Sequence, residues 1–391
     1  MADPVLRLRA PSDLNGHALQ RLGLIKGGSV VLEVSSDYEK LSEAFAPAGE
    51  VFAIQHLLSL ARRAVPLEVH WDRAIVSKMP ESAPIYPLLA CVLMLQGAQH
   101  RSSDLSDVAL AALVASSQKK VLQHRAMADL FSSSQILLCA DSRGFGRIPD
   151  LYERATGRLR SREDFQTLVF DLLASQLTGA VASANSSKFA ALLAVIFAEL
   201  VENTDVHGRL DGTGVPVGPD AMRGVAIKTI ALSLGEYRRR TVLYPARTLE
   251  CLEISVFDTG LGYFSSYTKQ ALLASVDISF EWKVFHNCLA RHFYPEVADG
   301  RSAHRAMGLN EVLRAIQDLR GRIEFRTGRL FAYRTFLEGE LQVQMESPES
   351  PLAQRHWPRP KLLDVDKRLT SIPTEHEAVV GSAVRILVPL A

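Results

Sequence analysis

The sequence predicts an α/β protein made of an N-terminal α/β domain at residues 1–150 and a C-terminal two-layer α+β sandwich at residues 160–391. The chain has 391 residues, which is more than one domain usually contains. Its first half alternates short apolar runs with helical patterns, as α/β layer proteins do. Its second half places helices ahead of a series of strands, which favours one sheet covered by one helical layer.

In the first half, β-branched or apolar runs bounded by turn residues predict strands, and apolar residues at helical spacing predict helices. The predicted strands are residues 29–35, 67–71 and 135–139, and the predicted helices are residues 51–63, 85–96 and 105–122. A segment rich in glycine and charge follows, and it places the domain boundary near residues 144–160.

In the second half, Ser161 to Asp164 has the outline of a capping box before a helix at 165–177. A second helix is predicted over 187–208, where Gly208 ends it. The strands predicted after these helices are residues 225–234, 249–258, 321–328 and 384–390. This order of elements is the basis for the α+β prediction.

Composition excludes several classes of protein. The chain has 44 Lys and Arg and 43 Asp and Glu, a net charge of +1, so no overall field attracts nucleic acid or an anionic membrane. The four cysteines lie far apart in the sequence, which disfavours a disulfide scaffold or a structural zinc site and favours a reducing cytoplasm. The N-terminus carries charges where a signal peptide needs an apolar core, and the most apolar stretch, residues 86–95, is about half of a membrane span.

The first candidate motif is a polar stripe at the end of the 187–208 helix. Glu199, Asn203 and His207 are spaced by four residues, so they follow one face of the helix after an almost wholly apolar run. A carboxylate and an amide on one face can bind Mg²⁺ and orient a water for attack on a phosphoryl group. The alternative is a helix end that turns polar as it reaches solvent.

The second motif follows the 249–258 strand, which ends in Asp258 and continues with Gly260 and Gly262. A carboxylate at a strand end can accept the exocyclic amine of a purine, and the glycines allow close approach of the backbone. The alternative is an ordinary Asp-x-Gly turn.

The third motif is Arg305 to Asn310, at the entry to an amphipathic helix. A helix N-terminus presents free N–H groups and the positive end of a dipole, both of which suit phosphate. Basic side chains gather in the same stretch: Arg291, His292, Arg301, His304 and Arg305. The alternative is a solvated loop before the helix.

The order of these motifs over residues 160–391 resembles the GHKL superfamily, the ATP-binding domains of DNA gyrase, heat-shock chaperones, histidine kinases and mismatch-repair proteins. The resemblance implies that Asn203 binds magnesium, that Glu199 activates water or an accepting hydroxyl, and that Asp258 binds the adenine amine. Gly260 and Gly262 would then shape the pocket around the base.

The same resemblance implies a lid at 263–307 and a phosphate-binding helix start at Gly308 and Leu309, with Arg305 just upstream. Ser382, after Gly381, is similar to the family's threonine near the adenine. The ending Asn-Thr-Asp-Val-His-Gly looks like anti-sigma-factor kinases and some histidine kinases, which places His207 at the site. Two departures are Ala306, where the family has glycine, and Val206, where gyrase and chaperone members have aspartate.

These features predict a Mg·ATP-binding protein that switches a protein partner. One hypothesis is an ATPase in which Glu199 orients water. A second is a kinase for a protein hydroxyl or histidine, and a third is a nucleotide sensor or interaction module without turnover. The N-terminal half is similar in pattern to a STAS domain, or is an unrelated α/β recognition domain; the partner is expected to be a protein, with a homodimer as a further option.

Overall fold

The structure is a computed structural model, and all structural statements below concern the residues that it describes. These are 5–9, 13–24, 28–34, 45, 48–63, 66–124, 126–132, 135–140, 149–153, 155–156, 160–161, 163–164, 167–169, 171, 186–209, 221–238, 248–290, 308–337, 343–344 and 359–390.

The N-terminal half contains a parallel sheet with strand order β1-β2-β3-β4. Its strands are β1 (Val5–Leu8), β2 (Ser29–Val34), β3 (Leu67–Trp71) and β4 (Gln99–Ser102). Its helices are α1 (Gly16–Leu24), α3 (Glu50–Arg63), α4 (Arg73–Ser82), α5 (Pro87–Met94), α6 (Asp107–Gln123) and α7 (Asp129–Ser132). Asp72 caps α4 and Ser106 caps α6, while a proline begins α5. The sequence predicted β2, β3, α3, α5 and α6, but not β1, α1, α4 or β4.

The second sheet has seven strands in the order β12-β9-β8-β13-β7-β6-β5, and every neighbouring pair is antiparallel. Its strands are β5 (Ile136–Ala140), β6 (Met222–Ser233), β7 (Thr248–Asp258), β8 (Arg322–Gly328), β9 (Leu330–Thr335), β12 (Leu363–Asp364) and β13 (Val379–Pro389). Short elements complete this half: η3 (Pro149–Leu151), α10 (Leu234–Arg238), and the paired strands β10 (Val343–Gln344) and β11 (Arg359–Pro360). The edge strand β5 comes from the part of the chain that was assigned to the N-terminal domain. The chain is therefore a mixed α/β protein with one parallel and one antiparallel sheet.

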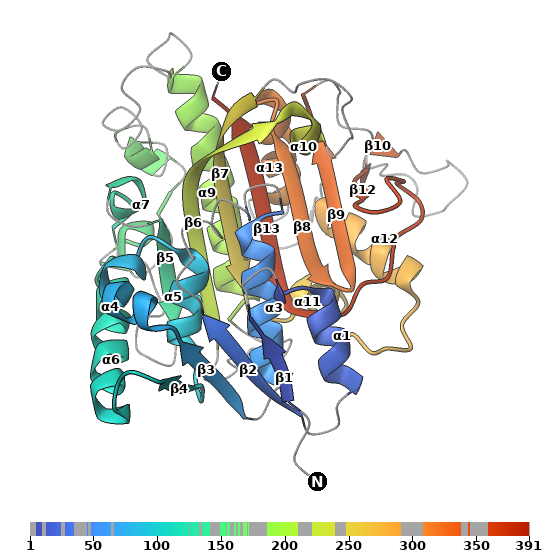
Figure 1. The fold of residues 1–391 in the computed structure, drawn as a ribbon. Helices are drawn as coiled ribbons and strands as arrows, with labels where there is room; N and C mark the ends of the chain where they lie inside the picture. Colours follow the sequence, from blue (N-terminus) through green and yellow to red (C-terminus); the bar gives the residue numbers. More distant parts are fainter. Residues whose placement is uncertain are drawn as a thin grey trace.

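One face of the seven-stranded sheet carries a helical layer, which lies behind the sheet in Figure 1. It consists of α9 (Ser186–His207), α11 (Gly262–Thr268), α12 (Ile278–Leu289) and α13 (Gly308–Asp318). The apolar residues of α9 and α13 form a continuous core with the sheet, including Phe197, Ile316 and Ile386, each at most 1% exposed. The helix predicted at 165–177 lies largely outside the described residues.

The opposite face of this sheet is covered by the N-terminal half, so the two-layer sandwich expected from the sequence is part of a three-layer arrangement. Helix α3 crosses the front of β13 (Figure 1), and Phe52 and Ile54 share a core with Phe257 and Ala383. The reason is visible in β7, where both faces of the strand are buried over its last eight residues. A strand buried on both faces needs a cover on each side.

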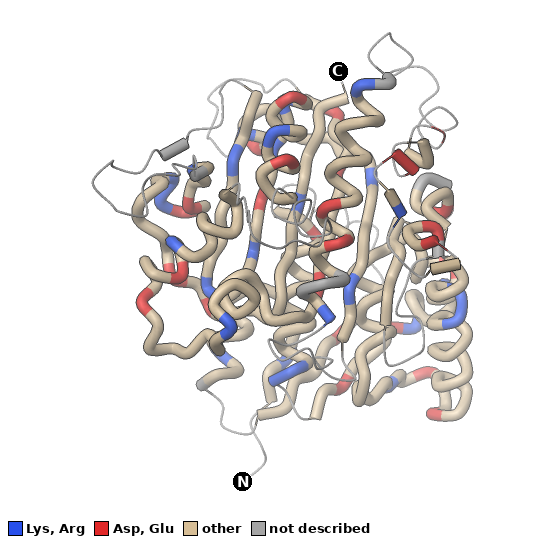
Figure 2. The backbone as a smooth tube through the Cα atoms, turned by 180° about the vertical axis from the view of Figure 1, so that it is seen from behind, with Lys and Arg blue, Asp and Glu red and all other residues tan. Residues whose placement is uncertain are grey.

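Charges of both signs are interspersed over the fold, as Figure 2 shows from behind, in agreement with the net charge of +1. Among the helices that the structure describes, none combines the length and the hydrophobicity of a membrane span. All four cysteines are free thiols.

Candidate functional site

The first predicted motif lies at the C-terminal end of α9. Glu199 is only 7% exposed, although its side chain carries a carboxylate. One turn later, the Nδ2 atom of Asn203 is buried and has no hydrogen-bond partner. The helix closes where the N–H of Gly208 donates to the Thr204 carbonyl at 3.0 Å. Because burying an amide nitrogen without a partner is unfavourable, the Asn203 side chain is a candidate for binding a ligand.

The end of α9 touches the end of β7, which carries the second motif. A Cβ atom at Gly208 would lie 2.7 Å from the Cβ of Asp258, closer than real Cβ atoms approach. Only glycine at this position allows the helix end to come so near the strand. The structure therefore places the end of α9 against Asp258 at the end of β7.

Asp258 lies directly opposite Ser382, because β7 and β13 pair in that register. Its Oδ2 accepts a hydrogen bond from the Ser382 hydroxyl at 2.5 Å, and its Oδ1 accepts one from the Gly260 N–H at 2.8 Å. Burial raises the pKa of Asp258 above the ordinary aspartate value, and these two hydrogen bonds oppose the rise. The Asp-x-Gly turn considered as an alternative is thus present, but Ser382 is an additional polar partner that such a turn does not require.

The third motif meets the first at the start of α13. A Cβ atom at Gly308 would lie 2.2 Å from the Oε2 of Glu199, so the glycine leaves room for this carboxylate. Helices α9 and α13 pack along each other, and Leu309 is buried in their shared core. The Glu199 carboxylate therefore lies beside the N-terminus of α13.

Gly262, Thr327 and Gly381 form a contact network beside Asp258. Thr327 Oγ1 accepts the N–H of Tyr263 at 3.2 Å and donates to the carbonyl of Gly381 at 3.3 Å. Gly262 has φ of +74°, a left-handed conformation that glycine adopts readily. The sequence reasoning missed Thr327, although its position at the end of a predicted strand, next to a glycine, could have indicated it.

Arg223 was also missed. It is 4% exposed on β6 and pairs in register with Asp258, where its positive charge lowers the pKa of the carboxyl. It lies in the segment between the predicted helix at 187–208 and the predicted strand at 225–234, and no local pattern marks it as part of a strand. The described part of that segment shows β6 starting at Met222.

Some predicted site residues lie outside the description. The His207 side chain and all of Arg305 are among them, as is the part of the expected lid from 291 to 307. The earlier part of that lid forms α11 and α12, which pack on the sheet. Glu281 on α12 forms an ion pair with Arg329 at 2.8 Å that fixes this helix to the β8–β9 turn.

The donor set is suited to Mg²⁺ held jointly with a phosphate-bearing ligand. Glu199 and Asn203 both offer oxygen atoms, which Mg²⁺ prefers. In the part of the chain that the structure describes, no group of three or more His, Cys, Asp or Glu side chains could hold a metal on its own. An ion at this site would therefore need further oxygen ligands, from water or from a bound ligand.

Comparisons with protein-family models, with curated proteins and with solved structures found no match for this chain. The assignment of a function therefore depends on the residues themselves. Gly208, at the end of α9, lies against Asp258, and Glu199, earlier on the same helix, lies beside the N-terminus of α13.

Proposed function

We propose that this chain binds Mg·ATP at the cluster formed by Glu199, Asn203, Asp258, Gly308 and Ser382, in the manner of the GHKL superfamily that its motif order resembles. The observation that carries the proposal is the convergence of three motifs from distant parts of the sequence. Gly208 is against Asp258, and Gly308 is against Glu199. Three unrelated local features, a helix end, a turn and a solvated loop, would have no reason to meet in this way.

The adenine would bind in the part of the proposed site that contains Asp258. Within the protein, the Asp258 carboxylate accepts hydrogen bonds from the Ser382 hydroxyl, the Gly260 N–H and the Ser382 backbone N–H. An ionised carboxylate has about four acceptor positions, so acceptor capacity for an exocyclic amine is left. Ser382 and Gly260 hold the acceptor in place before the base arrives, which reduces the cost of ordering it.

The phosphates would bind at the Glu199 end. The N-terminus of α13 supplies backbone N–H groups, and the Glu199 carboxylate lies beside it. Glu199 and Asn203 would hold magnesium, which when bound neutralises phosphate charge. In this arrangement Glu199 would accept the proton of a water, protein hydroxyl or imidazole that attacks the terminal phosphorus, while the bond from that phosphorus to the ADP oxygen breaks and ADP leaves.

The biological role that fits this site is a cytoplasmic switch in which ATP binding or turnover changes the state of a protein partner. The alternative is a nucleotide sensor or interaction module without turnover. The proximity of Glu199 to the helix start favours turnover, because a base and a phosphate-binding element are then adjacent.

Asp258→Asn tests nucleotide binding. Wild-type protein with Mg·ATP at 100 times its Kd should gain about 2.7 kcal/mol of stability, seen as a rise in Tm. In the variant, the amide nitrogen replaces one of the two acceptor oxygens, so we expect this rise to be lost. The measurement is differential scanning fluorimetry with and without Mg·ATP.

The matched control is Asp72→Asn, because Asp72 caps α4 far from the site and asparagine caps helices equally well. This control should keep the full shift with Mg·ATP. A shift that persists in Asp258→Asn would remove the adenine assignment, and no shift in the wild type would remove the proposed function.

Glu199→Ala tests turnover. Loss of a general base typically lowers a rate by 10² to 10⁴-fold, so we expect phosphate release or phosphoryl transfer to fall by about that factor while nucleotide binding is largely kept. The assay is incubation with γ-labelled ATP. Free phosphate indicates an ATPase, labelled protein indicates a kinase, and neither product indicates a sensor.

Glu202→Ala, on the same helix, is the control for this experiment, since it removes a carboxylate from a neighbouring position. Turnover that is unchanged in Glu199→Ala but lost in Glu202→Ala would reassign the base to Glu202. Turnover unchanged in both variants would exclude these carboxylates from the mechanism.

A further inference from the structure

Helix α3 of the N-terminal half makes specific polar contacts with the strands that carry the proposed base pocket. Gln55 Nε2 donates to the main-chain carbonyl of Asp258 at 3.4 Å, and the other polar atom of the Gln55 amide is buried without a partner. Farther along the helix, Arg63 Nη2 donates to the carbonyl of Ala378 at 2.5 Å. The helix therefore contacts the ends of both β7 and β13 from the side of the sheet opposite to α9.

Ser59 is the central contact. It is completely buried, and its Oγ donates to the Gln55 carbonyl at 2.7 Å while accepting the N–H of Val380 at 3.0 Å. The β13–β8 ladder is interrupted at this point, since Val379 pairs with Gly328 and the next pair is Ser382 with Thr327. Val380 and Gly381 thus form a β-bulge, in which a buried N–H needs another partner. Ser59 is that partner.

The bulge determines where Ser382 lies. Gly381 has φ of +61° and approaches Asp258 so closely that a Cβ atom there would be 2.0 Å from the Asp258 carbonyl oxygen. The next residue, Ser382, donates its hydroxyl to the Asp258 carboxylate. A chain of contacts therefore runs from α3 through Ser59 and the bulge to the group proposed to accept the adenine amine.

We infer that Ser59 and Gln55 are positioning residues through which the N-terminal half sets the affinity of the base pocket. This inference rests on the proposed function of the same site. Because coupling between two sites is reciprocal, adenine binding to Asp258 also stabilises the docking of α3 on the bulge. The N-terminal half and the nucleotide thus regulate each other across the sheet, without contact between the nucleotide and that half.

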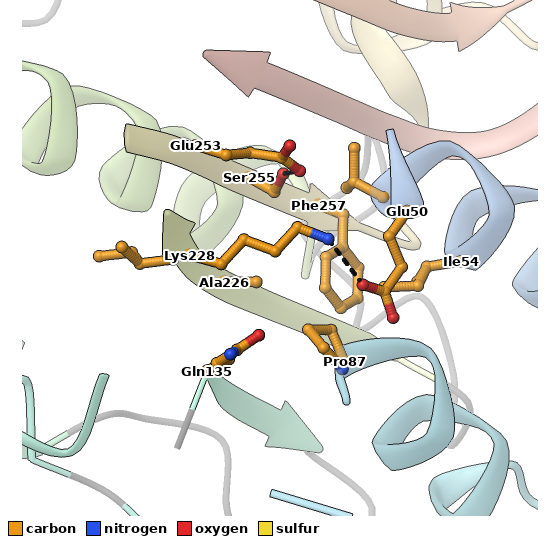
Figure 3. A pocket seen from close by; sticks show the side chains of 11 residues that line it. Glu50, Ile54, Pro87, Gln135, Ala226, Lys228, Glu253, Ser255 and Phe257 are labelled. Carbon is orange, nitrogen blue, oxygen red and sulfur yellow. Dashed lines mark hydrogen bonds and ion pairs between the residues drawn. The ribbon is translucent and has the colours of Figure 1, made fainter. Parts of the chain in front are cut away.

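A separate ion pair holds α3 on the sheet (Figure 3). Lys228 of β6 points toward Glu50, with Nζ and Oε2 3.0 Å apart, and the other oxygen of Glu50 accepts the N–H of Leu88 in α5. Burial lowers the pKa of Lys228, but the charges of Glu50 and Glu253 outweigh it, so the pKa lies above the ordinary lysine value. The first turn of α3 is therefore fixed independently of Ser59, and removing the Ser59 hydroxyl should leave the helix docked.

Ser59→Ala tests the inference, with the dissociation constants of ATP and of purine riboside triphosphate measured by calorimetry. The second ligand lacks the 6-amino group that Asp258 would accept. We expect the preference of the wild type for ATP to shrink by about tenfold in the variant, the scale of one hydrogen bond. A purely structural role would lower Tm without changing this ratio.

Ser117→Ala is the matched control. Ser117 is also completely buried in a helix, and its hydroxyl also donates to the carbonyl four residues earlier, at 2.8 Å, but it lies on α6 away from β13. The control should keep the wild-type ratio. An unchanged ratio in Ser59→Ala, with a wild type that prefers ATP, would overturn the coupling alone. A wild type that does not prefer ATP would overturn both the proposed adenine site and the coupling.

Amide exchange in the unmodified protein gives a second measurement, should Ser59→Ala fail to fold. Mg·ATP should slow exchange of the Val380 N–H and of the α3 amides more than purine riboside triphosphate does at equal occupancy. Equal protection by the two ligands would also overturn the inference.

Discussion

Replacing Arg385 by leucine is expected to lower the free energy of unfolding by about 3–5 kcal/mol. Arg385 is fully buried at the centre of the seven-stranded sheet, where its guanidinium lies 2.6 Å from Glu253 and 3.1 Å from Glu324. Both carboxylates are at most 2% exposed, so the variant leaves buried charge with too few partners. Urea denaturation at pH 7 measures the loss.

Arg7→Leu provides the comparison, because it breaks an arginine–glutamate pair that is exposed on both sides, Arg7 with Glu33 at 3.2 Å. Its cost should be below about 1 kcal/mol. A cost below 1 kcal/mol for Arg385→Leu would show that the sheet rearranges around the charges.

Gly381→Ala is expected to destabilise the protein by about 3 kcal/mol or more and to abolish the thermal shift with Mg·ATP. The residue has φ of +61°, and an added Cβ would lie 2.0 Å from the carbonyl oxygen of Asp258. That neighbour is backbone and cannot rotate away, so the strand ends must separate. Urea denaturation and fluorimetry with Mg·ATP measure the two effects.

Gly97→Ala separates the two causes of this cost. Gly97 has a similar φ of +69°, but nothing lies within 4 Å of the position of its Cβ. The Gly97→Ala variant should lose only about 1–2 kcal/mol of stability, the cost of a non-glycine residue at positive φ, and should keep the thermal shift with Mg·ATP. Equal costs for the two variants would mean that the close approach of Gly381 to Asp258 has no energetic importance.

The elements that were predicted from the sequence are those with a strong local pattern. Strands β2, β5 and β7 can be recognised from their apolar runs, and helix α3 from its amphipathic pattern. Strand β4, Gln-His-Arg-Ser, was missed because none of its residues is apolar, and it is a strand only because β3 supplies a partner. Strand β9 was also missed, because only Arg329 separates it from the end of β8 and no turn signal of ordinary length lies between the two strands.

The candidate site could be predicted as far as its residues are local motifs. Asp258 lies at the end of a predicted strand and Gly308 at a predicted helix start, and the structure places them against Gly208 and Glu199 of α9. The contribution of α3 could not be predicted, because Ser59 looks like any serine on a mixed helix face. Its importance comes from a β-bulge more than three hundred residues later in the chain, and the sequence does not reveal such a long-range contact.

The place of β13 in the sheet has a consequence for how the protein is made. β13 is the last of the strands in sequence order, yet it is the middle one of the seven in space, between β8 and β7. During translation, the edges of β7 and β8 that later pair with β13 stay unpaired until residues 379–389 leave the ribosome. A nascent chain would therefore expose these strand edges until residues 379–389 are available, and chaperones that shield strand edges would be needed most during that interval.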